Sequence, residues 1–166
     1  MSKVWVIFGT GAHARKAFHA AVLGGDSVAA FVDENPAAQA PVPGVPVLPG
    51  VPGVPVRPAA LLAVMPPADL FVAVGRADVR RRVMDEAAAL GWRLPPLLHP
   101  GACVAPDAVL GEGVLVAAGA VVESGVRIGR GCIVDIGVLI DHDCEVAEFT
   151  HLRAGQVCAA GTCWPA

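Results

Sequence analysis

The second half of the chain places an aliphatic side chain at every sixth position. Ten consecutive positions of this register hold Val, Leu or Ile: Leu98, Val104, Leu110, Val116, Val122, Ile128, Val134, Ile140, Val146 and Leu152. A period of six fits neither the turn of an α-helix nor the alternation of a flat strand. It is typical of a chain that coils around a prism, with one inward aliphatic per short strand. We therefore expect stacked coils around a continuous apolar core.

Glycines between the aliphatic positions support this interpretation. They are Gly111, Gly113, Gly119, Gly125, Gly129, Gly131 and Gly137. A tight corner favours a residue that lacks a Cβ atom. The alternative is a β-sandwich with regular turns, but its strands would alternate in longer and less uniform segments. The pattern favours a parallel β-helix.

The first half of the chain lacks the repeat, which predicts a second domain. The 166 residues suffice for two small domains, and we place the boundary before Pro95-Pro96, giving domains 1–94 and 95–166. No apolar run approaches the roughly twenty residues that span a bilayer. The apolar run at residues 4–8 is too short for the core of a signal peptide. We expect a cytoplasmic protein with no membrane span.

Charge and cysteine content exclude further classes of protein. The net charge is −3, and the one basic cluster, Arg76 with Arg80, Arg81 and Arg82, is mixed with acidic residues. We interpret this cluster as a solvated helix face and expect no nucleic-acid partner. The five cysteines form no CxxC pair and are odd in number, which favours reduced thiols in the cytoplasm.

The N-terminal residues predict the start of a nucleotide-binding βαβ unit. Residues 4–8 indicate a buried strand, 9–11 a glycine turn, 12–23 an Ala-rich helix and 28–32 a second strand. The acidic pair Asp33-Glu34 follows that strand, roughly twenty residues after the glycines, as in dinucleotide-binding folds. We therefore expect a Rossmann-like α/β domain.

The GTGAHA sequence at residues 9–14 matches the pattern GxGxxA. A turn that opens a helix presents backbone N–H groups and the positive end of the helix dipole to a phosphate. His13 either contacts a ligand or packs, and Asp33 and Glu34 would accept hydrogen bonds from a ribose or a base. The pattern alone also fits a nicotinamide or flavin site, or a turn without a ligand.

Ten of the fifteen prolines lie within residues 36–67, where the sequence VPGVPV occurs at 42–47 and again at 51–56. Repeated prolines predict an extended surface connection rather than a helix or a central strand. A ligand for an SH3-type domain is a weaker interpretation. Residues 70–74 then predict a third strand, and residues 79–90 a helix with one apolar face.

Polar residues of the repeat concentrate in DHDCE at 141–145 and EFTH at 148–151, after Asp135. General base catalysis needs an imidazole with a carboxylate to orient it, and Asp143 is placed to orient His142. These residues also fit exposed turns. A zinc site of His142, Cys144 and His151 is a further alternative, but the spacing departs from the usual ligand pairs, so we expect no metal.

Five segments carry a resemblance to a known family: FGTGAHA at 8–14, FVD at 31–33, VAVG at 72–75, LLHP at 97–100, and IDHDC at 140–144 followed by EFTH at 148–151. The chain resembles bacterial sugar acyltransferases that join a Rossmann-like N-terminal domain to a left-handed hexapeptide-repeat β-helix. These are the sialic-acid O-acetyltransferase type and the nucleotide-amino-sugar N-acetyltransferases that act on UDP-linked bacillosamine precursors or GDP-perosamine. The match spans nearly the whole chain.

The resemblance implies an acetyl-CoA-dependent N-acetyltransferase of a nucleotide-linked amino sugar in bacterial surface glycan synthesis. It also implies a homotrimer with active sites between neighbouring β-helices. His142 matches the catalytic base, Asp143 its partner acid and His151 a histidine close to the acetyl group. Ala160 and Gly161 would contact acetyl-CoA with His151, and the backbone N–H groups of residues 159–161 are candidates to stabilise the oxyanion. The implied nucleotide-sugar site comprises Gly9, Thr10, Gly11, His13, Asp33, Glu34, Gly75 and Arg76.

Two departures from the family leave alternatives open. Position 12 is Ala where the family often has Gly. The chain ends at Ala166, where the family continues with coils that help to hold coenzyme A, so we expect a C-terminally truncated β-helix. The alternatives are a sialic-acid-type O-acetyltransferase, or a catalytically impaired trimer that only binds a nucleotide sugar.

Overall fold

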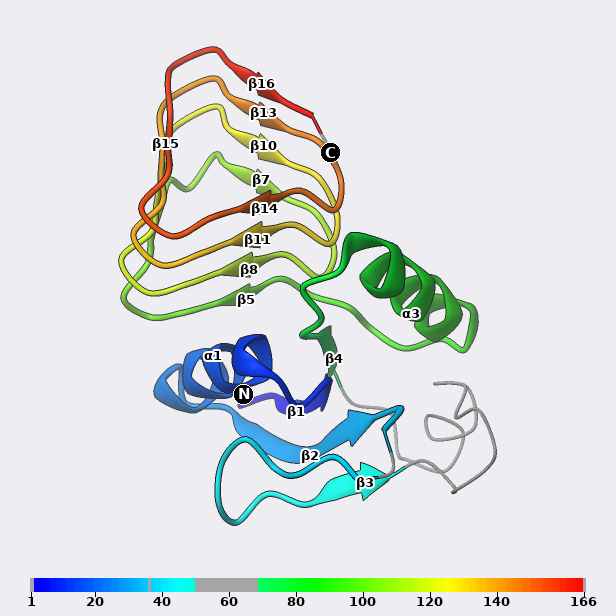
Figure 1. Cartoon of the computed structure of the whole chain (residues 1–166). Coiled ribbons are helices and arrows are strands. Elements are labelled where there is room, and N and C mark those ends of the chain that lie inside the picture. Colours follow the sequence, from blue (N-terminus) through cyan, green and yellow to red (C-terminus); the bar gives the residue numbers. More distant parts are fainter. Residues whose placement is uncertain (1, 36, 50–68, 166) are drawn as a thin grey trace. The chain divides into compact units, whose positions relative to one another are not determined.

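A computed structural model describes residues 2–35, 37–49 and 69–165 (Figure 1). The chain divides into two compact units, Met1–Leu94 and Pro95–Ala166. The second copy of the VPGVPV sequence, at 51–56, and the terminal Ala166 lie outside the described residues. Among the helices described, none has the length and apolar character needed to cross a bilayer.

The N-terminal unit is built on a four-stranded sheet with all strands parallel. Its strands, in spatial order, are β3 (Val47–Pro49), β2 (Ser27–Asp33), β1 (Val4–Phe8) and β4 (Asp69–Val72). Helix α1 (Ala12–Leu23) packs on β1 and β2, and helix α3 (Ala77–Ala89) packs on β4. All four residues of β4 are buried, as expected for a parallel strand. The predicted Rossmann-like fold is confirmed.

Part of the proline-rich stretch, predicted as an extended surface connection, forms the edge strand β3. Residues 47–49 pair in parallel with β2, from Phe31↔Val47 to Asp33↔Pro49. The strand lies at the edge of the sheet, where one side of the backbone needs no ladder hydrogen bonds. Proline is therefore compatible with this position, although it is not with a central strand.

The strand order creates a crevice in the N-terminal unit. The chain runs from β1 outward to β2 and β3, and then crosses to the other side of β1 to form β4. Ligands of open parallel α/β sheets bind at the carboxyl ends of the strands, at this reversal of strand order. The glycine turn after β1, the acidic pair at the end of β2 and residues 73–75 after β4 all lie at that edge.

The C-terminal unit is a left-handed parallel β-helix with three faces (Figure 1). The β14 sheet comprises β5 (Leu97–Leu98), β8 (Leu115–Val116), β11 (Ile133–Val134) and β14 (His151–Leu152). The β15 sheet comprises β6 (Cys103–Val104), β9 (Val121–Val122), β12 (Leu139–Ile140) and β15 (Val157–Cys158). The β16 sheet comprises β7 (Val109–Leu110), β10 (Arg127–Ile128), β13 (Glu145–Val146) and β16 (Cys163–Trp164).

Two rows of inward side chains form the core of the β-helix. The predicted aliphatic row is buried from Val116 to Leu152, whereas Leu98 at its start is 39% exposed. A second row lies two residues before the first and contains smaller side chains: Ala102, Ala108, Val114, Ala120, Val126, Cys132, Val138 and Cys144. Each coil therefore fills the prism with one large and one small residue per strand, a close packing that leaves little void.

From residue 113 to residue 161, one corner position in every six residues has a left-handed backbone. Glycine occupies this conformation at Gly113, Gly119, Gly125, Gly131, Gly137, Gly155 and Gly161, with φ between 63° and 72°. Asp143 (φ 58°) and Phe149 (φ 60°) occupy the same register without being glycine. This conformation costs a residue with a side chain about 1–2 kcal/mol. Such outliers cluster at functional sites, which directs attention to the coil of residues 141–149.

Candidate active site

A pocket of about 320 Å³ lies at the carboxyl ends of β1, β2 and β4. Seven of the eight residues predicted for the nucleotide-sugar site line it: Gly9, Thr10, Gly11, His13, Asp33, Glu34 and Gly75. Phe8, Ala73, Val74 and Val79 complete the lining. The pocket thus faces the first turn of α1, through Gly11 and His13, and the first turn of α3, through Val79.

The two glycines of the turn serve different purposes. Gly9 has φ 105°, and a Cβ atom added there would lie 3.1 Å from the carbonyl oxygen of Ala73. Gly11 has φ −79°, and an added Cβ would meet nothing within 4 Å. Gly9 is therefore required by the backbone, whereas Gly11, which lines the pocket, has room for a Cβ atom. No side-chain hydrogen bond caps α1, and the positive end of its dipole lies at the pocket, which Gly11 and His13 line.

The acidic side of the pocket is held by hydrogen bonds. Asp33 accepts a hydrogen bond from the Thr10 hydroxyl at 2.6 Å and another from the backbone N–H of Asn35 at 2.9 Å. Glu34 forms an ion pair with Arg82 at 2.7 Å. A carboxylate has about four acceptor positions, so both acids retain capacity for the hydroxyl groups of a sugar.

The eighth residue predicted for the nucleotide-sugar site, Arg76, does not line this pocket. Its side chain is 75% exposed and pairs with Asp78, two residues along the chain, with 3.1 Å between Nε and Oδ1. A local ion pair at the start of α3 therefore holds the guanidinium outside the pocket lining. The backbone of Arg76 remains at the site as the N-cap of α3.

The interpretation of the arginine cluster as a solvated face is wrong for Arg80. This side chain is fully buried and donates from Nη1 to the carbonyl oxygens of Val74, at 2.7 Å, and Gly75, at 2.9 Å. Its spacing gives a signal, because Arg80 shares the helical stripe of the buried Val83, Met84 and Ala87. The residue type points the other way, because arginine is usually exposed.

In the β-helix, His142 and Asp143 lie together at the corner between β12 and β13. Nδ1 of His142 is 2.8 Å from Oδ2 of Asp143. The neighbouring coils fix the backbone of both residues: the N–H of Asp143 donates to Ser124, and the carbonyl of His142 accepts from Gly161. The imidazole is 60% exposed, so a substrate has access to it.

Negative charges surround the His142 imidazole. The hydrogen bond to Asp143 and the charge of Asp141 raise the pKa of His142, and the more distant Glu123 acts in the same direction. An ionised carboxylate only accepts hydrogen bonds, so the ring hydrogen lies on Nδ1 and the lone pair on Nε2. The dyad therefore has the form of a general base with its orienting acid.

His151 lies away from this dyad. It belongs to β14, and its Nε2 is 3.6 Å from Oδ2 of the buried Asp135. His142 stands at the corner shared by the β15 and β16 sheets, which is opposite the face formed by the β14 sheet (Figure 1). Within a single chain, the coil therefore carries His142 and His151 to opposite sides of the β-helix.

Comparison with known proteins identifies the family. The model of the PglD N-terminal domain matches residues 5–87. The chain belongs to the PglD N-terminal domain family. None of the curated proteins matches it.

Solved structures extend the similarity of this PglD-family chain to the β-helix. The acetyltransferase domain of PglB from Neisseria gonorrhoeae FA1090, in complex with acetyl coenzyme A, is 33% identical with a TM-score of 0.81, over 95% of this chain and 73% of its own. A histidine-to-alanine mutant of GDP-perosamine N-acetyltransferase from Caulobacter crescentus, with CoA and GDP-perosamine, is 33% identical with a TM-score of 0.85, over 96% and 72%. WeeI from Acinetobacter baumannii AYE, at 18% identity and a TM-score of 0.75, over 93% and 71%, shares the fold.

Ala160 and Gly161 follow His142 and Asp143 by one full coil of the PglD-family chain. The N–H of Gly161 donates to the carbonyl of His142 at 2.9 Å, so it is already engaged in the β-helix. Among the described residues, the N–H of Ala160 donates to no backbone acceptor. Of the candidate oxyanion donors at residues 159–161, Gly161 is therefore the one whose N–H is already engaged in the described residues, whereas Ala159 and Ala160 donate to no backbone acceptor there.

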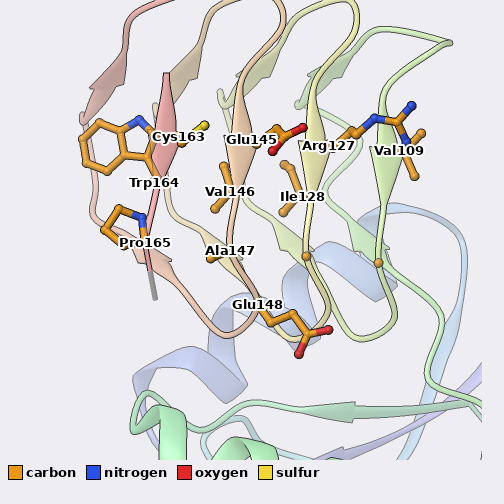
Figure 2. Close-up of a pocket in the computed structure, with 12 residues that line it drawn as sticks. Val109, Arg127, Ile128, Glu145, Val146, Ala147, Glu148, Cys163, Trp164 and Pro165 are labelled. Atoms are coloured by element: carbon orange, nitrogen blue, oxygen red, sulfur yellow. The ribbon is translucent and has the colours of Figure 1, made fainter. Parts of the chain in front are cut away.

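A groove of about 540 Å³, which the sequence did not indicate, runs along the β16 sheet (Figure 2). Val109, Arg127, Glu145 and Cys163 form its cross-strand row. Gly111, Gly129, Ala147, Glu148, Trp164 and Pro165 lie along the groove at and near the next corner. None of the predicted site residues lines this groove, so its size alone does not place the chemistry there.

Proposed function

We propose that this chain is an acetyl-CoA-dependent N-acetyltransferase that acts on a nucleotide-linked amino sugar in bacterial surface glycan synthesis. The observation that carries the proposal is the His142–Asp143 dyad, held at 2.8 Å on a corner whose backbone otherwise requires glycine. Similarity to the acetyltransferase domain of PglB and to GDP-perosamine N-acetyltransferase supports both the acyl donor and the class of acceptor.

In the proposed reaction, the neutral amine of the sugar attacks the thioester carbonyl of acetyl-CoA. Nε2 of His142 takes a proton from the amine, while Nδ1–H donates to Asp143 and the carboxylate stabilises the imidazolium. The tetrahedral intermediate places its negative oxygen against the Ala160 N–H. Collapse breaks the carbon–sulfur bond, and the CoA thiolate recovers the proton from His142. The products are the acetamido sugar and CoA–SH, with no covalent enzyme intermediate.

The pocket of the N-terminal unit supports binding of the nucleotide part of the substrate. Its α1 and α3 side offers helix N-termini, which favour negatively charged phosphates. Its β2 side offers Asp33 and Glu34, which accept hydrogen bonds from hydroxyl or base N–H groups. We therefore orient the diphosphate toward the helices and the nucleoside toward the two acids.

We propose a homotrimer as the active form. Within one chain, His142 and His151 lie on opposite sides of the β-helix. A neighbouring copy that presents its β14 face to the His142 corner would bring the two histidines into one site. Closed rings of identical subunits create such shared sites, one per interface.

We propose a cytoplasmic location for the reaction. All five cysteines are free thiols in the structure, as expected in a reducing compartment. Fractionation of cells that express the tagged chain tests this proposal, with activity expected in the soluble cytoplasmic fraction.

The decisive experiment measures thiol release from acetyl-CoA with UDP-, GDP- and dTDP-linked 4-amino sugars as acceptors. Turnover with one of these acceptors and not with its 4-hydroxy counterpart is expected for an N-acetyltransferase. His142→Ala should lower turnover at least about 10²-fold, because general base catalysis contributes that much. His99→Ala is the matched control, since His99 lies on another corner of the same β-helix. No thiol release with any acceptor would contradict the proposed function.

A further inference from the structure

We propose that Arg80 is a positioning residue for the diphosphate of the nucleotide sugar, an inference that rests on the proposed function. Arg80 is completely buried, although it comes from a helix whose neighbouring arginines are exposed. Its Nη1 donates at 2.7 Å to Val74 and at 2.9 Å to Gly75. Both acceptors belong to the turn after β4, which lines the pocket.

Two planar peptide bonds connect the orientation set by Arg80 with the pocket. The carbonyl of Val74 and the N–H of Gly75 belong to one trans peptide and point in opposite directions. The same holds for the carbonyl of Gly75 and the N–H of Arg76. Because Arg80 draws both carbonyls toward the protein interior, the two N–H groups point outward, on the side where Gly75 is exposed.

These two N–H groups are suited to an anion. Neither the N–H of Gly75 nor that of Arg76 donates to a backbone acceptor within the described part of the chain. Successive outward N–H groups form an anion-binding concavity, and Arg76 is also the N-cap of α3, at the positive end of its dipole. Gly75 additionally lies close to His13, since a Cβ atom added to it would be 3.3 Å from Cε1 of that ring. A displaced turn would therefore also disturb His13.

The buried guanidinium contributes a positive charge in addition to orienting the turn. It stands behind the turn in a low-dielectric interior, where its positive charge is weakly screened. Arginine supplies five donors in a rigid plane, whereas lysine supplies a compact ammonium on a flexible stem. Lysine would keep the charge but hold the two carbonyls less firmly. The comparison of arginine, lysine and methionine at position 80 thus separates the contribution of orientation from that of charge.

The test measures binding of a nucleoside and of its diphosphate to the full chain by calorimetry. For Arg80→Met we expect the Kd of the nucleoside diphosphate to rise about tenfold or more, which corresponds to one lost phosphate contact, and the Kd of the nucleoside to stay within about twofold. For Arg80→Lys we expect a Kd of the nucleoside diphosphate between the values of the wild type and of Arg80→Met. Arg81→Met is the matched control, because Arg81 is exposed on the same helix. In turnover, the KM for nucleotide sugar should rise while the KM for acetyl-CoA and kcat stay unchanged.

A measurement on the unmodified protein covers the case in which the Arg80 variants fail to fold. In ¹H–¹⁵N spectra, the amides of Gly75 and Arg76 should shift on addition of the nucleoside diphosphate and not of the nucleoside. Equal affinity of folded Arg80→Met and wild type for the diphosphate, or unmoved Gly75 and Arg76 amides at saturation, would overturn the inference. An equal loss of affinity for nucleoside and diphosphate would overturn it too. Absence of any nucleotide binding by the wild type would instead overturn the proposed function.

Discussion

At the scale of single residues, the chemistry depends on the protonation state of His142. Asp141 accepts a hydrogen bond from the His142 backbone N–H at 2.8 Å, and its charge helps to raise the pKa of the imidazole. Only the neutral imidazole accepts a proton, so kcat/KM should rise with pH through this raised pKa. Asp141→Asn keeps an acceptor oxygen and removes the charge. We predict that it shifts the acidic limb of the pH–rate profile to lower pH.

The control for this shift is Glu112→Gln, because Glu112 lies on a different corner and does not contribute to the pKa of His142. Its profile should coincide with that of the wild type. If Asp141→Asn left the acidic limb in place, His142 would not be the group whose deprotonation limits the rate.

Gly125 gives a second prediction at this scale. A Cβ atom added to Gly125 would clash with Oδ1 of Asp143, because the two atoms would be closer than Cβ contacts in real structures. The carboxylate must then move away from its position beside His142, and misplaced catalytic groups lose rate. We predict that Gly125→Ala lowers kcat about tenfold or more, measured by thiol release at saturating substrates.

Gly137→Ala separates this effect from backbone strain. Gly137 has φ 64°, close to the 72° of Gly125, but a Cβ atom there would meet nothing within 4 Å. Both variants should lose about 1–2 kcal/mol of unfolding free energy, because both force a side chain into the left-handed region. Equal kcat values for the two variants would show that Gly125 does not position the dyad.

The residues that the sequence identified well are those whose partners are adjacent in the chain. His142 and Asp143 are neighbours, so their hydrogen bond follows from local geometry. The burial of Arg80 follows from its place on the apolar stripe of α3, but its partners do not, because the carbonyls of Val74 and Gly75 are backbone groups that carry no residue-specific signal. The ion pair of His151 with Asp135 was not predictable in the same way, because the two residues are sixteen positions apart and meet only through the stacking of coils.

At the scale of secondary-structure elements, the connection between β1 and α1 contains one glycine that we expect to be needed for folding and one that we expect to be needed for binding. Gly9 is confined by the Ala73 carbonyl and by its φ of 105°, whereas Gly11 has an ordinary φ and open space around it. We predict that Gly11→Ala leaves the melting temperature unchanged and weakens nucleoside diphosphate binding, because the added methyl group projects into the pocket. Gly9→Ala should lower the melting temperature. Calorimetric titration and thermal unfolding distinguish the two; undiminished affinity of Gly11→Ala would mean that the ligand does not approach this turn.

A strand, turn or coil was predictable from the sequence where a recurrent type of residue indicates it. The aliphatic register and the corner glycines gave the coils of the β-helix, and the glycine turn with Asp33 gave the βαβ unit. The second row, from Ala102 to Cys144, was not predicted, because its alanine, valine and cysteine residues do not form a distinctive pattern. Strand β3 escaped notice because prolines around it indicate a connection, and only tertiary pairing with β2 makes it a strand.

At the scale of the whole molecule, the separation of His142 from His151 determines how many chains a site needs. His142 occupies the corner between the β15 and β16 sheets, and His151 the opposite face. A rigid β-helix with a close-packed core cannot bring these two positions together. If both histidines act on one acetyl group, the site must take each histidine from a different copy.

This arrangement predicts rescue when two inactive variants share one oligomer. His142→Ala and His151→Ala chains, each of low activity alone, are co-expressed in equal amounts with different tags, and oligomers carrying both tags are purified. With random mixing, about one quarter of all sites combine an intact His142 with an intact His151 from the neighbouring chain. Thiol release by the unselected oligomers should therefore recover to about a quarter of the wild-type rate. Oligomers selected for both tags should recover a larger fraction. Separately purified variants mixed without subunit exchange should show no recovery. If the co-expressed oligomers stay as inactive as the single variants, both histidines act within one chain or only one of them acts, and the shared site is refuted.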